Sequence, residues 1–294
     1  MYTDRNGLKW FKGNLHMHTT DSDGRMSPED VMRLYKDNGY DFIALTDHWH
    51  VNKPCTFEGM TVLRGCEYDD EQRPRDGFYH IVGIGMDHDP GILEGTGLRV
   101  WDIVKAIKEA GGLVDLAHPA WSLDSPEQII AIKDADFTEI YNSVSGMPNN
   151  CRPYSGAVLD LVAARGVYLP LAGVDDAHWY KEGFDRCRTF TYVQAESGAP
   201  DDLLAAMRAG KMYASQGPTM DVRREGDEIV IDCSPVCEIV WFNDRPWTPH
   251  RSVVGENLTG ACYRIHERDS FVRVEIKDAE GRYAWSGFLP VQNT

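Results

Sequence analysis

The feature of this chain that most constrains its fold is the position of its histidines. Six of the ten histidines lie at the ends of short apolar runs, and carboxylates accompany them. The histidines are His16 and His18 in NLHMHTTDSDG, His48 in FIALTDH, His80 in FYHIVGIG, His118 in LVDLAHP and His178 in LAGVDDAH. The accompanying carboxylates are Asp23, Glu67 and Asp176. A fold that gathers these groups at one end of many strands would bring together ligands suited to zinc, manganese or iron.

Each histidine taken alone is more simply a hydrogen-bonded core or surface residue. The joint pattern is harder to explain in that way, because polar groups buried at so many strand ends would be costly without partners. A shared metal cluster would satisfy all of them at once. The pattern therefore predicts a multi-metal hydrolase.

Strand-like and helix-like segments alternate up to about residue 215. The predicted strands are short, rich in Val, Ile, Leu and Phe, and show little alternation, as expected for strands covered on both faces. They cover residues 13–18, 40–46, 61–66, 78–85, 112–117, 137–141 and 167–174. Ser27 and Pro28 open a helix that Gly39 ends, and further helices are predicted at 98–110, 125–133, 154–165 and 200–209. This order predicts an α/β barrel with its active site at the carboxyl ends of the strands.

The pattern of predicted secondary structure changes beyond residue 216. Segments such as GPTMDVRREGDEIVIDCSP and CEIVWFND are typical of short strands joined by Gly, Asp, Asn and Pro turns. We therefore predict two domains with a boundary near Gln216. Residues 1–215 would form the metal-dependent barrel, and residues 216–294 a small antiparallel β domain.

Charge and composition narrow the partners. A net charge of −16 argues against binding to a nucleic acid polymer or an anionic membrane, since both need basic patches. A small anionic substrate stays possible because bound divalent ions reverse the local potential. The N-terminus has no apolar stretch long enough for a signal peptide, and no run approaches the length of a membrane span. Seven scattered cysteines without a C-x-x-C pair favour reduced thiols in a cytoplasmic protein.

The ordered motifs resemble those of the PHP (polymerase and histidinol phosphatase) family. They are His-x-His-Thr with Ser-Asp-Gly, Thr-Asp-His, Gly-x-Glu, a strand-borne His, Ala-His-Pro and Asp-x-His, which run from His16 to His178. The resemblance covers about two thirds of the chain. The resemblance implies a distorted seven-stranded (β/α) barrel that holds two or three divalent ions of manganese, zinc or iron. It also implies hydrolysis of phosphate esters. The β-rich tail is similar to that of a subgroup that includes carbamate hydrolases.

The resemblance assigns nine side chains to three metal positions. The ligands of the first ion would be His16, His18 and Asp176. The second ion would be held by His80 and His118, with Glu67 bridging the first two ions. The ligands of the third ion would be Asp23, His48 and His178. Catalysis would proceed by in-line attack of a hydroxide that bridges two metals, with Glu67, Asp176 and His178 as the catalytic side chains. A third ion or a protonated His178 would assist the leaving oxygen.

Two aspartates precede His178, and only one matches the motif. We assign Asp176 because Asp-x-His preserves the spacing, and we expect Asp175 to be a neighbouring hydrogen-bond acceptor. Asp47 could orient the adjacent His48 or form a turn. Two residues at the end of another predicted strand could touch substrate or brace a ligand, Glu139 and Asn142.

Several cationic and aromatic residues near the ligand segments are candidates for substrate contact. The candidate phosphate contacts are Arg64, Arg73, Arg75, Lys181, Arg186 and Arg188. We favour Arg186 and Arg188, which follow the Asp-x-His loop. Three tryptophans could form walls of the pocket, although packing is the simpler explanation for any one of them: Trp49, Trp121 and Trp179.

The leading hypothesis is a metal-dependent phosphoesterase. It would release phosphate from a small organic phosphate such as a nucleotide or a sugar phosphate. One alternative is a carbamate, amide or ester hydrolase that uses the same metal site. Another is a non-catalytic, metal-stabilised binding module.

Overall fold

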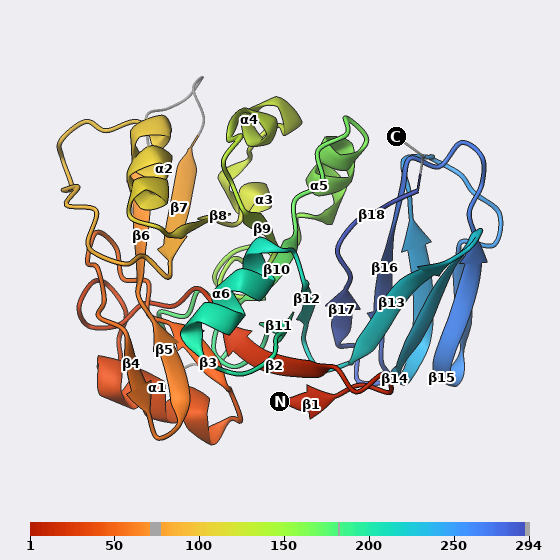
Figure 1. Cartoon of the computed structure of the whole chain (residues 1–294), viewed down its shortest axis with the longest axis horizontal. Helices are drawn as coiled ribbons and strands as arrows, with labels where there is room; N and C mark the ends of the chain where they lie inside the picture. The colour runs from red at the N-terminus through yellow and green to blue at the C-terminus, as the bar shows by residue number, and fades with distance from the viewer. Residues whose placement is uncertain (71–77, 182, 292–294) are drawn as a thin grey trace.

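The computed structural model describes residues 1–70, 78–181 and 183–291. Their strands form one five-stranded sheet and one thirteen-stranded sheet, with helices packed on the outside (Figure 1). This is a mixed α/β fold, as the sequence predicts.

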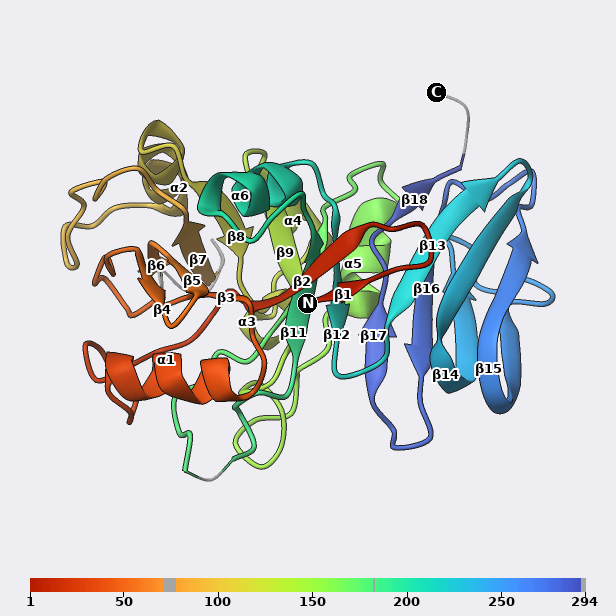
Figure 2. The same cartoon turned by 60° about the horizontal axis from the view of Figure 1, so that its bottom comes forward.

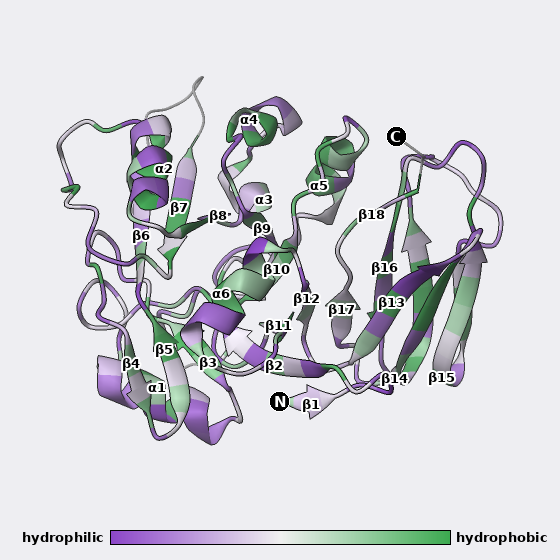
Figure 3. Ribbon diagram, in the orientation of Figure 1, coloured by the Kyte–Doolittle hydropathy of each residue, from purple (hydrophilic) through white to green (hydrophobic). Residues whose placement is uncertain are grey.

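The five-stranded sheet is formed within the first two thirds of the chain. Its strands are β6 (Gly65–Asp70), β7 (Tyr79–Ile84), β8 (Leu113–Leu116), β9 (Phe137–Asn142) and β10 (Leu171–Val174). β8, β9 and β10 run parallel, whereas β7 is antiparallel to both β6 and β8. Nearly every residue of these strands is buried, which explains the apolar sequences of β7 and β10, whereas β6, β8 and β9 also bury acidic residues. Figure 3 shows hydrophobic residues along β10.

The larger sheet begins with the N-terminal strands. These are β1 (Tyr2–Thr3), β2 (Lys9–Asn14), β3 (Phe42–Ala44), β4 (Cys55–Phe57) and β5 (Met60–Leu63). β2, β3 and β5 pair in parallel. On its other side β2 pairs antiparallel with β11 (Phe190–Gln194), which pairs with β12 (Met212–Ser215).

Two single bridges connect the sheets just beyond their strand ends. Met17, which follows β2, pairs in parallel with Ala177, which follows β10. His48, which follows β3, pairs in parallel with Glu67 in β6. The bridges bring ligand-bearing segments that are far apart in the sequence side by side.

The helices match the sequence prediction closely. They are α1 (Pro28–Asp37), α2 (Val100–Glu109), α3 (Pro119–Ser122), α4 (Pro126–Ala131), α5 (Gly156–Ala163) and α6 (Pro200–Arg208). The Ser27 hydroxyl accepts a hydrogen bond from the Asp30 backbone N–H, and Pro28 occupies the first turn, so α1 begins where its capping residues predict. No helix among the described residues combines the length and the apolar character needed to cross a membrane.

The C-terminal strands extend the larger sheet. They are β13 (Met220–Glu225), β14 (Glu228–Phe242), β15 (Ser252–Arg264), β16 (Phe271–Lys277), β17 (Tyr283–Trp285) and β18 (Leu289–Pro290). All their pairings are antiparallel. β17 pairs with both β12 and β16 and so joins this segment to the rest of the sheet (Figure 2). Trp10 of β2 and Tyr213 of β12 pack into the apolar cluster around Trp241, which makes the contact between the two parts hydrophobic.

Some predicted bounds are wrong. The first strand covers Lys9–Asn14 and not 13–18, because pairing with β3 ends at Asn14 and the chain then leaves the ladder. The strand predicted at 167–174 begins only at Leu171, directly after Pro170, which lacks a backbone N–H. β11 and β12 were not predicted, although the sequence FTYVQ of β11 is rich in β-branched and aromatic residues.

Candidate metal centre

All nine predicted ligands lie together at one end of the two sheets. Six of them follow a strand or sit near its end: His16 and His18 follow β2, His48 follows β3, His118 follows β8, and Asp176 and His178 follow β10. Glu67 and His80 lie within β6 and β7, and Asp23 lies in the loop before α1. The sequence places these side chains in this way because each apolar run ends where the buried strand does.

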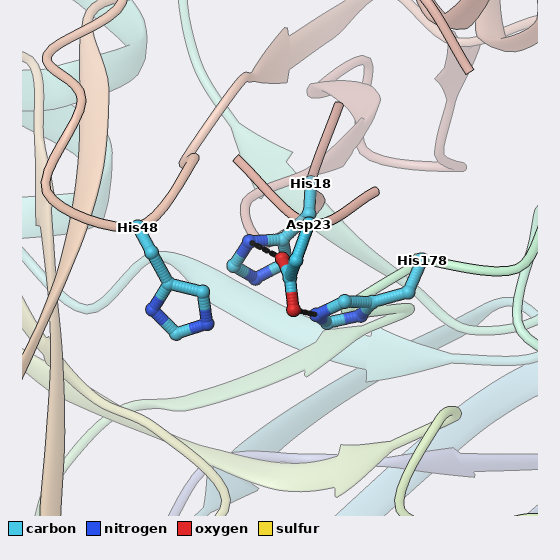
Figure 4. Close-up of side chains that lie close together, drawn as sticks. All are labelled: His18, Asp23, His48 and His178. Atoms are coloured by element: carbon cyan, nitrogen blue, oxygen red, sulfur yellow. Dashed lines mark ion pairs between the residues drawn. The ribbon is translucent and has the colours of Figure 1, made fainter. Parts of the chain in front are cut away.

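The nine side chains form three overlapping groups whose ligand atoms lie within 4.8 Å of one another. Group 1 contains His16, His18, Glu67 and Asp176. Group 2 contains Glu67, His80 and His118. Group 3 contains His18, Asp23, His48 and His178 (Figure 4).

Group 1 has the spacing of a closed coordination shell. His16 Nε2 lies 3.2 Å from His18 Nε2 and 3.1 Å from Glu67 Oε2. Asp176 Oδ1 lies 3.3 Å from His16 Nε2 and 3.1 Å from His18 Nε2. Ligand atoms held about 2.0–2.2 Å from a tetrahedral ion are roughly 3.3–3.6 Å apart, so a small outward adjustment would fit zinc or a similar ion.

Glu67 connects groups 1 and 2 through its two oxygens. Oε2 lies 3.0 Å from His18 Nε2, whereas Oε1 lies 2.9 Å from His80 Nδ1 and 3.6 Å from His118 Nε2. One carboxylate thus faces two nitrogen clusters, which is the arrangement of a bridging ligand in two-metal hydrolases. The side chain is almost completely buried, so both oxygens are committed to these groups.

Group 3 is looser and nearer to solvent. Asp23 Oδ2 lies 3.5 Å from His178 Nε2, and Asp23 Oδ1 lies 3.6 Å from His18 Nδ1 (Figure 4). The rings of His18 and His178 stack with centroids 4.1 Å apart. The Asp23 side chain is 59% exposed, in contrast to the buried ligands of groups 1 and 2. An ion held here would be more accessible to substrate and easier to remove.

The residues present fit metal ions by a direct structural criterion. Asp176 Oδ1 is buried and accepts no hydrogen bond of normal geometry among the described residues. Even so, nitrogens of His16, His18 and His178 lie 3.1–3.5 Å from it. The Nε2 atoms of His16 and His18 and this carboxylate oxygen form a donor set suited to a divalent ion, whereas His178 Nδ1 donates to the Asp176 backbone carbonyl at 2.7 Å. A buried polar atom without a partner is otherwise rare.

The pKa values of His18 and His178 reflect the charges of the neighbouring ligands. Burial disfavours charge on His18, but the carboxylates of Asp176 and Glu67 outweigh burial and raise its pKa to about 9. Burial and the neighbouring His18 lower the pKa of His178, so this ring is neutral at pH 7. A neutral ring can bind a metal, which is consistent with the place of His178 in group 3.

Glu139 and Asn142 brace group 1 from behind. Glu139 Oε1 accepts a hydrogen bond from His16 Nδ1 at 2.6 Å, and its Oε2 accepts from the His118 backbone N–H at 2.8 Å. Asn142 Nδ2 donates to Glu139 Oε2 at 2.8 Å and to Asp176 Oδ2 at 3.0 Å. In the neutral ring this bond keeps the proton on Nδ1 and aims the Nε2 lone pair at group 1, the usual carboxylate–histidine–metal arrangement.

Asp47 organises the ligand loop and makes no bond to the His48 ring. Its carboxylate accepts hydrogen bonds from the Thr19 N–H and hydroxyl, from Ser22 Oγ and from Asn52 Nδ2. These bonds fix the turn that carries Asp23. Asp175 is likewise an acceptor, as expected, for Tyr35 Oη and the backbone N–H groups of residues 188 and 189.

Three polar residues near the site were not predicted from the sequence. Ser122 Oγ lies 3.1 Å from His118 Nδ1, and Asp185 accepts from the backbone N–H groups of His178 and Trp179. Asp115 is fully buried in β8, where burial and then Glu139 raise its pKa well above the usual range. An Asp inside the apolar run LVDL was the available signal for Asp115. No motif marks the other two.

Two ligands hold unusual backbone conformations. His118 has a φ of 29° and Asp176 a φ of 52°. Residues other than glycine rarely adopt such backbone angles, which cost on the order of 1–3 kcal/mol each and concentrate at functional sites. The turns after β8 and β10 thus aim these ligands inward at a local conformational cost.

The ligand groups open into a pocket of about 260 Å³. Trp121 and Trp179 line it, whereas Trp49 lies elsewhere and donates its Nε1–H to Asp69 at 2.6 Å. Arg188 lines a second cavity of about 790 Å³ together with Arg282 and the 143–151 loop, and Arg186 lines neither. Arg64 donates to the Met86 carbonyl, and the candidates Arg73 and Arg75 lie outside the described residues.

Comparison with known proteins supports the fold. No protein-family model and no curated protein sequence matches the chain. A solved structure of a two-domain protein from Bacteroides vulgatus, which contains a predicted PHP-like metal-dependent phosphoesterase, matches with a TM-score of 0.58 at 17% identity. The match covers 98% of each chain. This chain therefore shares the fold of that protein along almost its whole length, as the PHP resemblance implies.

Two further solved structures are similar over part of the chain. An amidohydrolase from Chromobacterium violaceum, with bound sulfate and no metal, has a TM-score of 0.44 at 16% identity and covers 59% of this chain and 90% of its own. A proposed metal-dependent phosphoesterase from Bifidobacterium adolescentis has a TM-score of 0.41 at 16% identity, covering 56% of this chain and 87% of its own. These similarities are too low for an argument about function.

Proposed function

We propose that this protein is a metal-dependent phosphoesterase that releases phosphate from a small organic phosphate. The observation that carries the proposal is the pair of ligand groups joined by Glu67, whose two oxygens lie 2.9 Å from His80 Nδ1 and 3.0 Å from His18 Nε2. A bridging carboxylate between two nitrogen-rich groups is typical of two-metal phosphoryl transfer sites. Groups 1 and 2 would hold two divalent ions of manganese, zinc or iron, and group 3 a third.

Divalent ions at these positions would lower the pKa of water and neutralise phosphoryl oxygens. The reaction then forms one P–O bond from water and breaks the P–O bond to the leaving group, which departs as an alcohol. The side chains of the site would hold and orient the ions for this reaction. Glu67 and Asp176 carry the negative charge that holds the ions, and Glu139 fixes the His16 tautomer. Val144 and Trp121 contribute apolar surface to the pocket lining.

We further propose that the elements around the site form a distorted seven-stranded barrel. The single bridges of Met17 with Ala177 and of His48 with Glu67 support this, because they link β2 to β10 and β3 to β6. The ring would then run β2, β3, β6, β7, β8, β9 and β10. Residues 1–215 would form this barrel domain and residues 216–294 the small β domain.

The test is p-nitrophenol release from p-nitrophenyl phosphate by manganese-loaded protein. Glu67→Ala, prepared identically, removes both bridging oxygens and should abolish release. Glu109→Ala is the matched control, because Glu109 lies on α2 with an exposed side chain. Bound metal is measured in every sample. Release by the wild type and Glu109→Ala alone would support the proposal.

No release by wild-type protein that has its metal bound would refute it. The carbamate, amide and ester substrates would then be tested on the same samples. Turnover of one of those substrates that requires Glu67 would assign the site to the alternative hydrolase.

A further inference from the structure

We infer that Trp121 and Trp179 form a leaving-group subsite that selects phosphate monoesters of aromatic alcohols. This inference rests on the proposed function and names its substrate class. Both side chains line the pocket that holds the metal ligands. No motif or comparison assigns them a role.

Trp121 borders the group 2 end of the ligand cluster. Its ring centroid lies 4.8 Å from that of His118 and 5.7 Å from that of His80, and both contacts are edge-on. Phe78 packs against the same indole with centroids 5.5 Å apart. These contacts hold the Trp121 ring in one orientation beside two ligands while part of it stays accessible in the pocket.

Trp179 borders the group 3 end. It follows the ligand His178 in the chain, and its backbone N–H donates to Asp185 at 2.6 Å. The guanidinium of Arg25 lies 3.7 Å from the ring centroid and fixes one face of the indole by a cation–π contact. Both tryptophans thus line the pocket with rings that neighbouring side chains already hold in place.

The rest of the lining limits the kind of group that fits. The pocket is also lined by Val144 and the neutral polar residues Ser145, Asn149 and Asn150. Among the described lining residues the negative charges belong to the metal ligands, and no lysine or arginine is present. The phosphoryl group would therefore rely on the ions for charge neutralisation, and the pocket offers the leaving group apolar and aromatic surface.

The volume of the pocket also favours a small aromatic leaving group. The pocket of about 260 Å³ lies just below the range of about 300–1,000 Å³ typical of sites for drug-sized ligands. One phosphoryl group and one ring are of the right scale, whereas a polymer is too large. An aromatic ring is favoured because stacking on a tryptophan adds to the area it buries.

The test compares two monoesters whose leaving alcohols have similar acidity, phenyl phosphate and hexafluoroisopropyl phosphate. Manganese-loaded wild type should show a kcat/KM for phenyl phosphate about tenfold or more above that for the aliphatic ester, the scale of one stacking contact. Trp121→Ala and Trp179→Ala should each lose most of this preference. Trp121→Phe should keep it, and Trp247→Ala is the control, since Trp247 is 73% exposed.

A binding measurement separates this inference from the proposed function. Phenylphosphonate should bind the metal-loaded protein about tenfold more tightly than ethylphosphonate, in a manner that depends on both tryptophans. If the wild type hydrolyses neither ester and still shows this difference, the phosphoesterase proposal fails and the aromatic subsite stands. Equal kcat/KM for the two esters, or alanine variants that reduce both equally, would overturn the subsite and assign the tryptophans to packing.

Discussion

Replacing Glu139 by glutamine tests whether the support behind the ligands sets metal affinity. Glu139 is fully buried and accepts hydrogen bonds from His16 Nδ1, the His118 backbone N–H and Asn142 Nδ2. Glutamine has almost the same shape but offers an acceptor at only one end. In either orientation its NH2 group faces a donor that Glu139 now satisfies.

The size of the effect follows from these contacts. If the amide oxygen faces His16, the NH2 group opposes the N–H groups of His118 and Asn142. If the NH2 group faces His16, the imidazole must accept at Nδ1 and carry its proton on Nε2, the atom that faces group 1. A lost hydrogen bond to a charged group costs about 1.5–3 kcal/mol. The affinity for the group 1 ion should therefore fall roughly 10- to 100-fold, the usual range for loss of such a partner.

The assay is zinc competition with a chromophoric chelator, combined with metal content by elemental analysis. Glu109→Gln on the exposed face of α2 is the control. Asn142→Ala should give a smaller loss, because it removes one donor and leaves the carboxylate in place. A folded Glu139→Gln variant with zinc affinity within about twofold of the wild type, against the 10- to 100-fold expected, would refute the reasoning.

Three further predictions concern stability and pH. Saturating manganese or zinc should raise the unfolding free energy, by about 2.7 kcal/mol at a concentration 100 times Kd, and EDTA should reverse the gain; an unchanged melting temperature would contradict this. The metal-free protein should lose stability as pH rises from about 6.5 through about 9, because folding raises the pKa of His18 and its stabilising charge is lost there. Zinc affinity should rise over the same window, and calorimetry that detects no proton release on binding would exclude this coupling. Arg273→Met should destabilise the metal-loaded protein by about 3 kcal/mol in urea unfolding, since it leaves Asp160 and Glu275 without their buried partner; a loss below about 1 kcal/mol would show that these carboxylates are solvated instead.

Much of the candidate site could be read from the sequence. The ligand segments end buried apolar runs, and a strand covered on both faces has to end where polar side chains begin, so His48, His118 and His178 mark strand ends without any structure. Helix caps such as Ser27 and Pro28 are equally local, because the capping bond joins residues three apart. Local physics of this kind predicted the alternation of strands and helices and the helix positions, and the resemblance to the PHP motifs added the nine predicted metal ligands, which the structure brings together.

Only the tertiary structure decided how these side chains are divided among the three ligand groups. Which oxygen of Glu67 faces which histidines depends on the bridge between His48 and Glu67, and on the register of β6 with β7. Neither is encoded within one segment. The roles of Asp185 and Ser122 were invisible because each acts through contacts with a ligand segment after folding. The sequence offered Trp49, Trp121 and Trp179 equally as walls of the pocket, and only the folded loops show that Trp121 and Trp179 line it and that Trp49 does not.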